Sequence, residues 1–134
     1  LQSKFKSSTN ITFAGRKTAE EIILLMKKCK ALIFPSIWYE GQPYTILEAF
    51  ATGTPVIASK LGAMESIVTH NFNGLHFEPG NSNDLSNAIA AFNNSAGKVH
   101  FYTNARQTYL NNYHPDIHFT SIMKIYTDAI NNKH

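Results

Sequence analysis

The sequence predicts an α/β fold: a doubly wound, Rossmann-like parallel sheet with helices on both faces. Four short apolar runs, rich in β-branched and aromatic residues, alternate with helical patterns, and polar residues hardly interrupt the runs. Parallel neighbours need crossover connections, which the helices supply, and strands that are apolar throughout are typical of a sheet buried on both faces. With 134 residues, the chain has room for a single domain, residues 1–134.

The first predicted elements are a strand and a capped helix. Residues 10–14 form an apolar run that ends at Gly15, which is typical of a buried strand. Thr18 and Glu21 have the spacing of a capping box, and apolar residues then recur at helical intervals as far as Cys29. A free cysteine in this pattern is expected to be a small buried hydrophobe, and a single cysteine favours a reducing, cytoplasmic setting.

Three more strands and five more helices are predicted beyond Cys29. Each strand is a short apolar run that stops at Pro, Gly or polar residues, and the runs are residues 31–34, 54–58 and 74–77. The helical patterns occupy residues 43–52, 63–68, 84–92, 98–112 and 116–131. The last two are separated at His114-Pro115 and are expected to pack as closing helices.

Composition excludes several classes of protein. The longest apolar runs are far shorter than the roughly 20 residues that span a bilayer. Residues 1–10 are polar and lack the apolar core of a signal peptide, so the chain is interpreted as a segment of a longer protein. The six histidines show no metal-site spacing, so no metal is predicted. The formal charge of +3 suits an anionic ligand, but the lysines are scattered, which argues against a nucleic-acid partner.

The predicted binding rim is the carboxyl edge of the sheet, where ligands of open parallel sheets bind. Four segments that follow predicted strands are expected to share it: residues 15–17, 36–42, 59–63 and 78–80. The second segment leads into a helix expected to begin at Pro43, an arrangement that leaves the neighbouring amides free. With Gly41 permitting close approach, the N–H groups around Gln42, Tyr44 and Thr45 are expected to hold a diphosphate. An ordinary strand-to-helix turn is an equal alternative at this point.

Two carboxylates lie near this turn. Glu48 falls among apolar residues of the predicted helix, and burying a carboxylate without partners costs several kcal/mol. Glu48 is therefore expected to face the crevice and to accept hydrogen bonds from vicinal sugar hydroxyls. A solvent-facing helix residue is an equal alternative for Glu48, and a solvated loop acid is favoured for Glu40.

The stretch EGQPYTILEAFATGTPVIAS, residues 40–59, closely resembles the signature of the group 1 glycosyltransferases, the retaining GT-B enzymes of family 4. It contains their motif of two glutamates separated by seven residues, here Glu40 and Glu48. The resemblance covers residues 10–92 and includes Phe13-Ala-Gly15 and residues 62–68, 73–75 and 79–80. The resemblance implies a C-terminal, nucleotide-sugar-binding half of a GT-B hexosyltransferase that transfers a sugar with retention, in glycan biosynthesis.

The resemblance also implies a role for each matching position. Glu40, as the catalytic acid, would contact the hydroxyls of the transferred sugar, and Glu48 would bind the ribose hydroxyls. The diphosphate would contact the backbone of Gly41, Gln42, Pro43, Tyr44 and Thr45. The nucleobase would be recognised by the backbone of Gly15, Arg16 and Lys17. Gly62 would lie near the donor. No metal and no cofactor would be required, since the nucleotide diphosphate sugar is a co-substrate.

The sequence departs from the family pattern before residue 10. The family stabilises the departing diphosphate with an Arg and a Lys after the first strand of this domain, and neither Lys4 nor Lys6 matches them. The N-terminal domain that supplies most of the acceptor site is also missing, so this chain alone is expected to be inactive. The implied partners are a nucleotide-sugar donor, that N-terminal domain and an unidentified acceptor. The resemblance leaves open whether the parent enzyme also associates peripherally with the cytoplasmic face of the membrane. The alternatives are a non-catalytic nucleotide-sugar-binding or regulatory module and another GT-B enzyme, such as a nucleotide-sugar epimerase.

Overall fold

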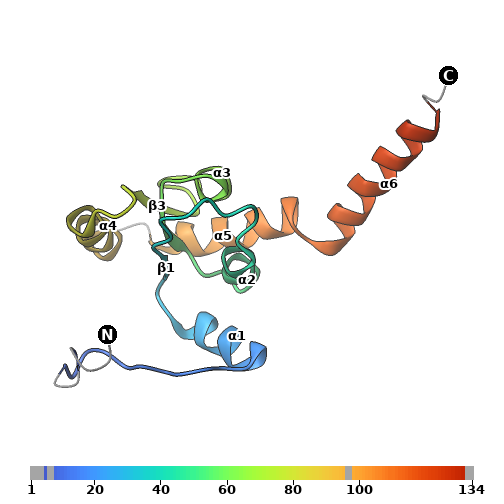
Figure 1. The fold of residues 1–134 in the computed structure, drawn as a ribbon. Coiled ribbons are helices and arrows are strands. Elements are labelled where there is room, and N and C mark those ends of the chain that lie inside the picture. The colour runs from blue at the N-terminus through green and yellow to red at the C-terminus, as the bar shows by residue number, and fades with distance from the viewer. Residues whose placement is uncertain (1–4, 6–7, 96–97, 132–134) are drawn as a thin grey trace.

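A parallel sheet of three strands forms the centre of the protein (Figure 1). The structure is a computed structural model that describes residue 5 and residues 8–95 and 98–131. Strands β1 (Leu32–Phe34), β2 (Val56–Ser59) and β3 (Gly74–Phe77) lie side by side in that order. Leu32 is in register with Val56, and Val56 is in register with Gly74, so all three carboxyl ends meet at one edge. The predicted α/β class with a parallel sheet is confirmed.

The described residues form six helices. They are α1 (Ala19–Lys28), α2 (Tyr44–Ala51), α3 (Ala63–Ile67), α4 (Ser82–Asn94), α5 (Lys98–Asn112) and α6 (Pro115–Asn131). The predicted capping box of α1 is present, because Glu21 N–H donates to Thr18 Oγ1 and Thr18 N–H donates to Glu21 Oε2. α4 begins two residues earlier than predicted, since the side chain of Asn81 accepts hydrogen bonds from two amides of its first turn.

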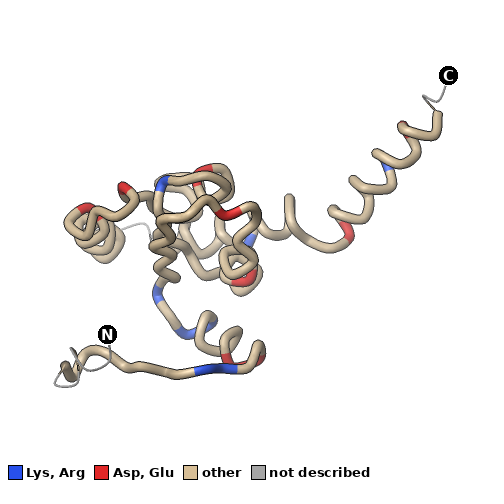
Figure 2. The backbone as a smooth tube through the Cα atoms, viewed as in Figure 1, with Lys and Arg blue, Asp and Glu red and all other residues tan. Residues whose placement is uncertain are grey.

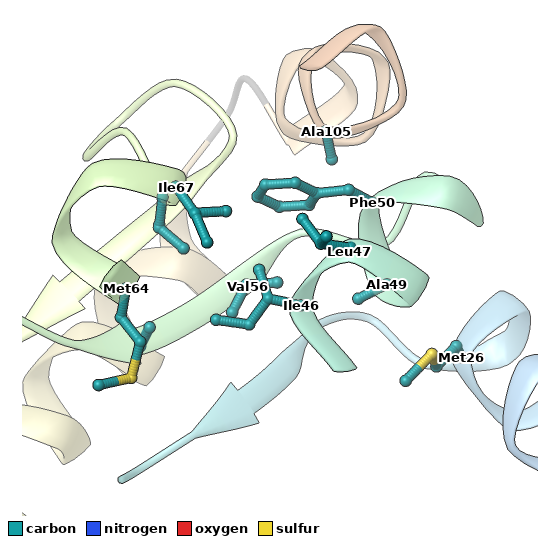
Figure 3. Close-up of a cluster of buried hydrophobic side chains, with 11 residues drawn as sticks. Met26, Ile46, Leu47, Ala49, Phe50, Val56, Met64, Ile67 and Ala105 are labelled. Carbon is teal, nitrogen blue, oxygen red and sulfur yellow. The ribbon is translucent and has the colours of Figure 1, made fainter. Parts of the chain in front are cut away.

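Helices cover both faces of the sheet and bury two apolar cores. On one face, Val56 and Ala58 pack against α2 and α3, and Ala105 of α5 points toward Phe50 of α2 (Figure 3). On the other face, α4 and α5 cover Ile57 and the strand β3; this core consists of Ile57, Leu75, Phe77, Phe92 and Phe101. The alternation of side chains along β2 therefore explains why this strand is buried throughout.

The last two helices differ in their packing. α5 packs along α2 and contributes to both cores, as expected for a closing helix. α6 instead projects away from the body of the molecule (Figure 1), and none of its residues is buried. The prediction that both helices close the domain is therefore wrong for α6. The described part of the chain contains no helix long and apolar enough to cross a membrane.

Residues 10–14 do not form the predicted strand. They are exposed, and they pair with none of the three strands that the structure describes. A strand is stabilised by hydrogen bonds to a neighbour, so an apolar run without a neighbour does not become one. The side chains of Ile11 and Phe13 consequently remain exposed.

Cys29 and the apolar residues of α1 are also more exposed than expected. Cys29 caps the end of α1, is exposed, and its thiol donates to the carbonyl oxygen of Met26. Partial desolvation raises the pKa of this thiol above its ordinary value. Met26 is the only buried residue of α1. Because the lead-in to α1 does not join the sheet, α1 packs only lightly on the body, beside α2.

Candidate functional site

Three loops meet at the carboxyl edge of the sheet. Residues 35–43 follow β1 and lead into α2, residues 60–62 follow β2 and lead into α3, and residues 78–81 follow β3 and lead into α4. Since the strands are parallel, these loops share one rim, as three of the four predicted segments were expected to do. Figure 2 shows acidic residues along this part of the backbone, whereas many of the basic residues lie on α1 and its lead-in.

The first turn of α2 has free amides. Pro43 is the N-cap rather than the first helical residue, so the predicted helix start is one residue too early, and as a proline it offers no N–H. No side chain caps this helix, and its first turn contains no acid. Among the hydrogen bonds of the described residues, none engages the N–H of Tyr44 or Thr45, whereas Ile46 N–H donates to the Pro43 carbonyl. This end of α2 therefore offers two donors and a positive dipole to an anion.

Glu40 is half-buried and held by the loop that carries it. The hydroxyl of Ser36 lies 3.4 Å from Glu40 Oε1 and accepts a hydrogen bond from Trp38 N–H at 3.3 Å. These contacts fix the loop between β1 and α2 in a tight local turn. One carboxylate oxygen of Glu40 thus has a weak protein partner, and the other is available to a ligand.

Glu48 is exposed on α2, while Ile46, Leu47, Ala49 and Phe50 face the core. Its carboxylate has no hydrogen-bond partner among the described residues. It lines a cavity of about 360 Å³ together with side chains from α1, α2 and α5; these are Ile23, Tyr44, Leu47, Ala51, Thr52, Tyr109 and Tyr113. Burial raises the pKa of the Tyr113 phenol, so this group remains a neutral donor at physiological pH.

A second hollow adjoins the cavity beside Glu48. Its volume is about 310 Å³, and its walls include Gln42 and His118. The two hollows share Tyr44, Leu47 and Tyr113. The structure thus brings the start of α2 and Glu48 together along one groove between α2 and α5.

Gly62 lies next to the first loop. Its backbone has φ of 54° and ψ of −134°, a conformation that residues with a side chain rarely adopt. A Cβ atom at this position would lie 3.0 Å from Cδ1 of Tyr39. Gly62 therefore permits the loop after β2 to approach the loop after β1.

Residues 15–17 lie elsewhere. They follow no strand, and the ammonium group of Lys17 forms an ion pair with Glu21 at 3.1 Å. Lys17 lines a separate hollow along α1, and it lines neither of the hollows beside Tyr44. The expectation that this segment shares the rim is wrong for the described structure, because residues 10–14 do not enter the sheet.

A cavity of about 350 Å³ that no sequence pattern predicts lies at the outer edge of β3, lined by Lys60, His70, His76, Phe77, Glu78 and Asp84. The rings of His70 and His76 stack with centroids 6.2 Å apart. Desolvation, His76 and Lys60 together lower the pKa of His70. The two histidines are six residues apart, a spacing that does not predict their contact. Within the described residues, no three His, Cys, Asp or Glu side chains are grouped so that they could hold a metal ion.

Comparisons with known proteins found sequences similar to this chain. The sequence model of the family described as "Glycosyl transferases group 1" matches residues 1–108. Over 81 residues, the chain is 38% identical to an uncharacterized glycosyltransferase of Methanocaldococcus jannaschii, covering 60% of this chain and 23% of that protein. Over 109 residues, it is 28% identical to the UDP-Gal:alpha-D-GlcNAc-diphosphoundecaprenol alpha-1,3-galactosyltransferase of Escherichia coli, covering 81% of this chain and 28% of that protein.

The fold has matches among solved structures as well. The sucrose-phosphate synthase of Thermosynechococcus elongatus superposes with a TM-score of 0.83 at 25% sequence identity, covering 96% of this chain and 32% of that one. The chain thus spans between about a fifth and a third of the length of these relatives.

Proposed function

This chain belongs to the group 1 glycosyltransferases, and on that basis we propose that it is the donor-binding half of an enzyme that uses a nucleotide diphosphate sugar. The observation that supports this most strongly is the start of α2, where Tyr44 and Thr45 have free amides and Tyr44 lines the same groove as the unpartnered Glu48. The name of the galactosyltransferase relative includes a UDP-sugar donor. We therefore take UDP-galactose as the first donor to test.

The amides of Tyr44 and Thr45 would bind the diphosphate. They point out of an uncapped helix end, where the dipole favours negative charge. Apart from its two chain neighbours, Gly41 has no residue within 4 Å of where its Cβ would be, so the backbone before Gln42 is open to a ligand. Pro43 would contribute the shape of the turn rather than a donor.

The two glutamates would bind the sugars at either end of the donor. Glu48 would accept hydrogen bonds from the ribose hydroxyls, and Glu40 would contact the hydroxyls of the transferred sugar. Hydrogen bonds to a carboxylate are stronger than those between neutral groups, which suits both carboxylates to this task. Gly62 would leave space beside the donor.

Transfer would require parts that lie beyond residues 1–134. We propose that a parent enzyme contributes an N-terminal domain for the acceptor and an Arg and a Lys for the diphosphate, and that it transfers the sugar with retention and without a metal. Charge stabilisation on the leaving group and alignment of the acceptor both contribute strongly to the rate. By itself, the chain would bind donor and at most hydrolyse it slowly.

One observation favours a second candidate function, a non-catalytic nucleotide-sugar-binding module. Among the residues that the structure describes, no Lys or Arg lines either of the two hollows beside Tyr44. If this is also true of the whole protein, the site would bind a donor without assisting departure of its diphosphate.

A radiolabelled-donor assay tests the proposal and separates the two candidates. UDP-, GDP- and ADP-sugars are first screened for binding to the 134-residue chain and to the parent protein, and the bound donor is then offered with acceptors. We expect both proteins to bind one donor and only the parent to transfer it. Donor binding without transfer by the parent would favour the non-catalytic module. Transfer by the 134-residue chain at the parent's rate would contradict the proposal that transfer requires further parts of the parent enzyme.

A further inference from the structure

Three exposed aromatic side chains lie within four residues of Glu40 in the sequence. Tyr39, Trp38 and Tyr44 have exposed fractions of 82%, 74% and 71%. Only Val99 and Ile130 are comparably exposed among the large apolar side chains that the structure describes, and both lie on the last two helices. Aromatic rings bury much apolar area when they find a partner, so such a group beside a candidate site indicates a ligand surface.

The loop that carries Trp38 and Tyr39 is held in place. Ser36 Oγ accepts from Trp38 N–H, and the same hydroxyl lies within hydrogen-bonding distance of the Trp38 carbonyl and of Glu40 Oε1. A local network of this kind fixes the backbone although the rings project outward. The two rings are therefore presented at a defined place on the rim.

The loop after β2 supports the ring of Tyr39. The Cα of Gly62 lies against this ring, closely enough that a Cβ would come within 3.0 Å of Cδ1 and 3.8 Å of Cε1. The contact covers little of the ring, since 82% of Tyr39 stays exposed. Gly62 thus supports one part of the ring and leaves the rest available.

We propose that Trp38 and Tyr39 form an aromatic platform on which a pyranose ring stacks, beside the carboxylate of Glu40. A pyranose has an apolar C–H face that suits an aromatic ring and hydroxyl groups that suit a carboxylate, and the loop presents both kinds of group within three consecutive residues. This inference rests on the proposed function, because it assigns the platform to a sugar bound at the donor rim. The pyranose belongs either to the donor or to the acceptor.

The fluorescence of Trp38 tests the platform directly, because Trp38 is the only tryptophan of the chain. The chain is titrated with UDP-galactose, with UDP and with methyl galactoside. We expect UDP-galactose to change the emission more than UDP does at saturation, and methyl galactoside to change it at millimolar concentration. The platform would be overturned if methyl galactoside left the emission unchanged and UDP-galactose changed it no more than UDP does. Failure of UDP to bind in calorimetry would count against the proposed function, and the methyl galactoside titration would still decide the platform.

Kinetics of the parent protein distinguish the two sources of the pyranose. Trp38→Ala and Tyr39→Ala should raise the KM of the sugar that stacks by about three- to tenfold, the scale of an aromatic stacking contact, whereas Trp38→Phe keeps a ring and should change it less. A raised donor KM assigns the platform to the donor, and a raised acceptor KM assigns it to the acceptor. Tyr126→Ala, on the exposed surface of α6, is the matched control. If neither KM responds in the two alanine variants, or if the control responds equally, the platform is refuted.

Discussion

The backbone N–H of His76 donates a hydrogen bond to Nδ1 of His70, with 3.0 Å between the two nitrogen atoms. The Nε2 of His76 lies 2.7 Å from the carbonyl oxygen of Val68, so that nitrogen carries a proton. Nδ1 of His76 is buried and has no hydrogen-bond partner in the described part of the chain. The first contact requires an unprotonated Nδ1 on His70, and the two hydrogen bonds join the turn after α3 to the edge strand β3.

Acidification should therefore weaken the fold through His70. Its folded pKa is lowered, first by desolvation and then by His76 and Lys60, so the stabilising contribution is fully present above the unfolded pKa of about 6.5 and is lost as pH falls through the folded pKa. We expect the loss to be at most about 1 kcal/mol, because the ring is largely exposed and the hydrogen bond is partly replaced by water.

Urea unfolding between pH 7.5 and 5 measures this effect. His70→Asn retains an acceptor near the position of Nδ1 but does not titrate, so its free energy of unfolding should depend less on pH than that of the wild type. His118→Asn, on the exposed surface of α6, is the control. Identical pH dependence in His70→Asn and the wild type would contradict the assignment.

Gly74 should tolerate no side chain. A Cβ there would lie 2.0 Å from the Val56 carbonyl oxygen and 2.9 Å from Val68 Cγ1, so β2 and β3 would have to separate. Gly74→Ala should lower the free energy of unfolding by about 3 kcal/mol or more, at the upper end of overpacking effects. Thermal melts compare it with Gly41→Ala, where a Cβ meets no atom within 4 Å. Equal stability of the two variants would show that the register of β2 and β3 is wrong.

Glu48→Gln should weaken binding of UDP while leaving the fold stable. The side chain is exposed and has no described partner, so its replacement removes no contact of the fold, whereas hydrogen bonds from ribose to a charged acceptor would be lost. Calorimetry should show a loss of about 1.5 to 3 kcal/mol in the binding free energy. Glu65→Gln, at an exposed ion pair with Lys60, is the control. Unchanged affinity in Glu48→Gln would exclude the ribose role.

Tyr44→Pro and Tyr44→Ala should distinguish the contribution of the Tyr44 backbone amide to UDP binding from that of its ring. Tyr44 is the first residue of α2, where proline is tolerated because its missing N–H has no helical partner. The substitution removes a donor to the diphosphate, while Tyr44→Ala removes the ring and keeps the donor. We expect UDP to bind about tenfold more weakly to Tyr44→Pro than to Tyr44→Ala, from the loss of a hydrogen bond to a charged group. Equal affinities, with circular dichroism showing intact helices, would place the diphosphate elsewhere.

Much of the fold follows from local patterns in the sequence. The apolar runs of β1, β2 and β3 and the capping box of α1 depend on short-range chemistry, and each is found as predicted, within one or two residues. Residues 10–14 show the limit of such reasoning. Their composition favours a strand, but a strand forms only beside a neighbour, and no residue-level pattern reveals whether one is present.

The site was predictable only where backbone chemistry determines it. The uncapped start of α2 follows from Gly41, Gln42 and Pro43, although the helix start was placed one residue too early. The contact of Tyr39 with Gly62 and the stacking of His70 on His76 arise from packing between separate loops. Sequence spacing contains no signal for contacts of this kind.

A ¹H–¹⁵N NMR titration of the chain with UDP tests most directly whether the groove at the start of α2 binds a nucleoside diphosphate. The account predicts that the amide resonances of Tyr44 and Thr45 shift most strongly, with smaller shifts around Glu48, and that Glu48→Gln reduces all of them at a given UDP concentration. Resonances from the C-terminal end of α6, which projects away from the body of the molecule in Figure 1, should stay in place. Shifts confined to the cavity of His70 and His76, or saturable binding that leaves Tyr44 and Thr45 unchanged, would contradict the account.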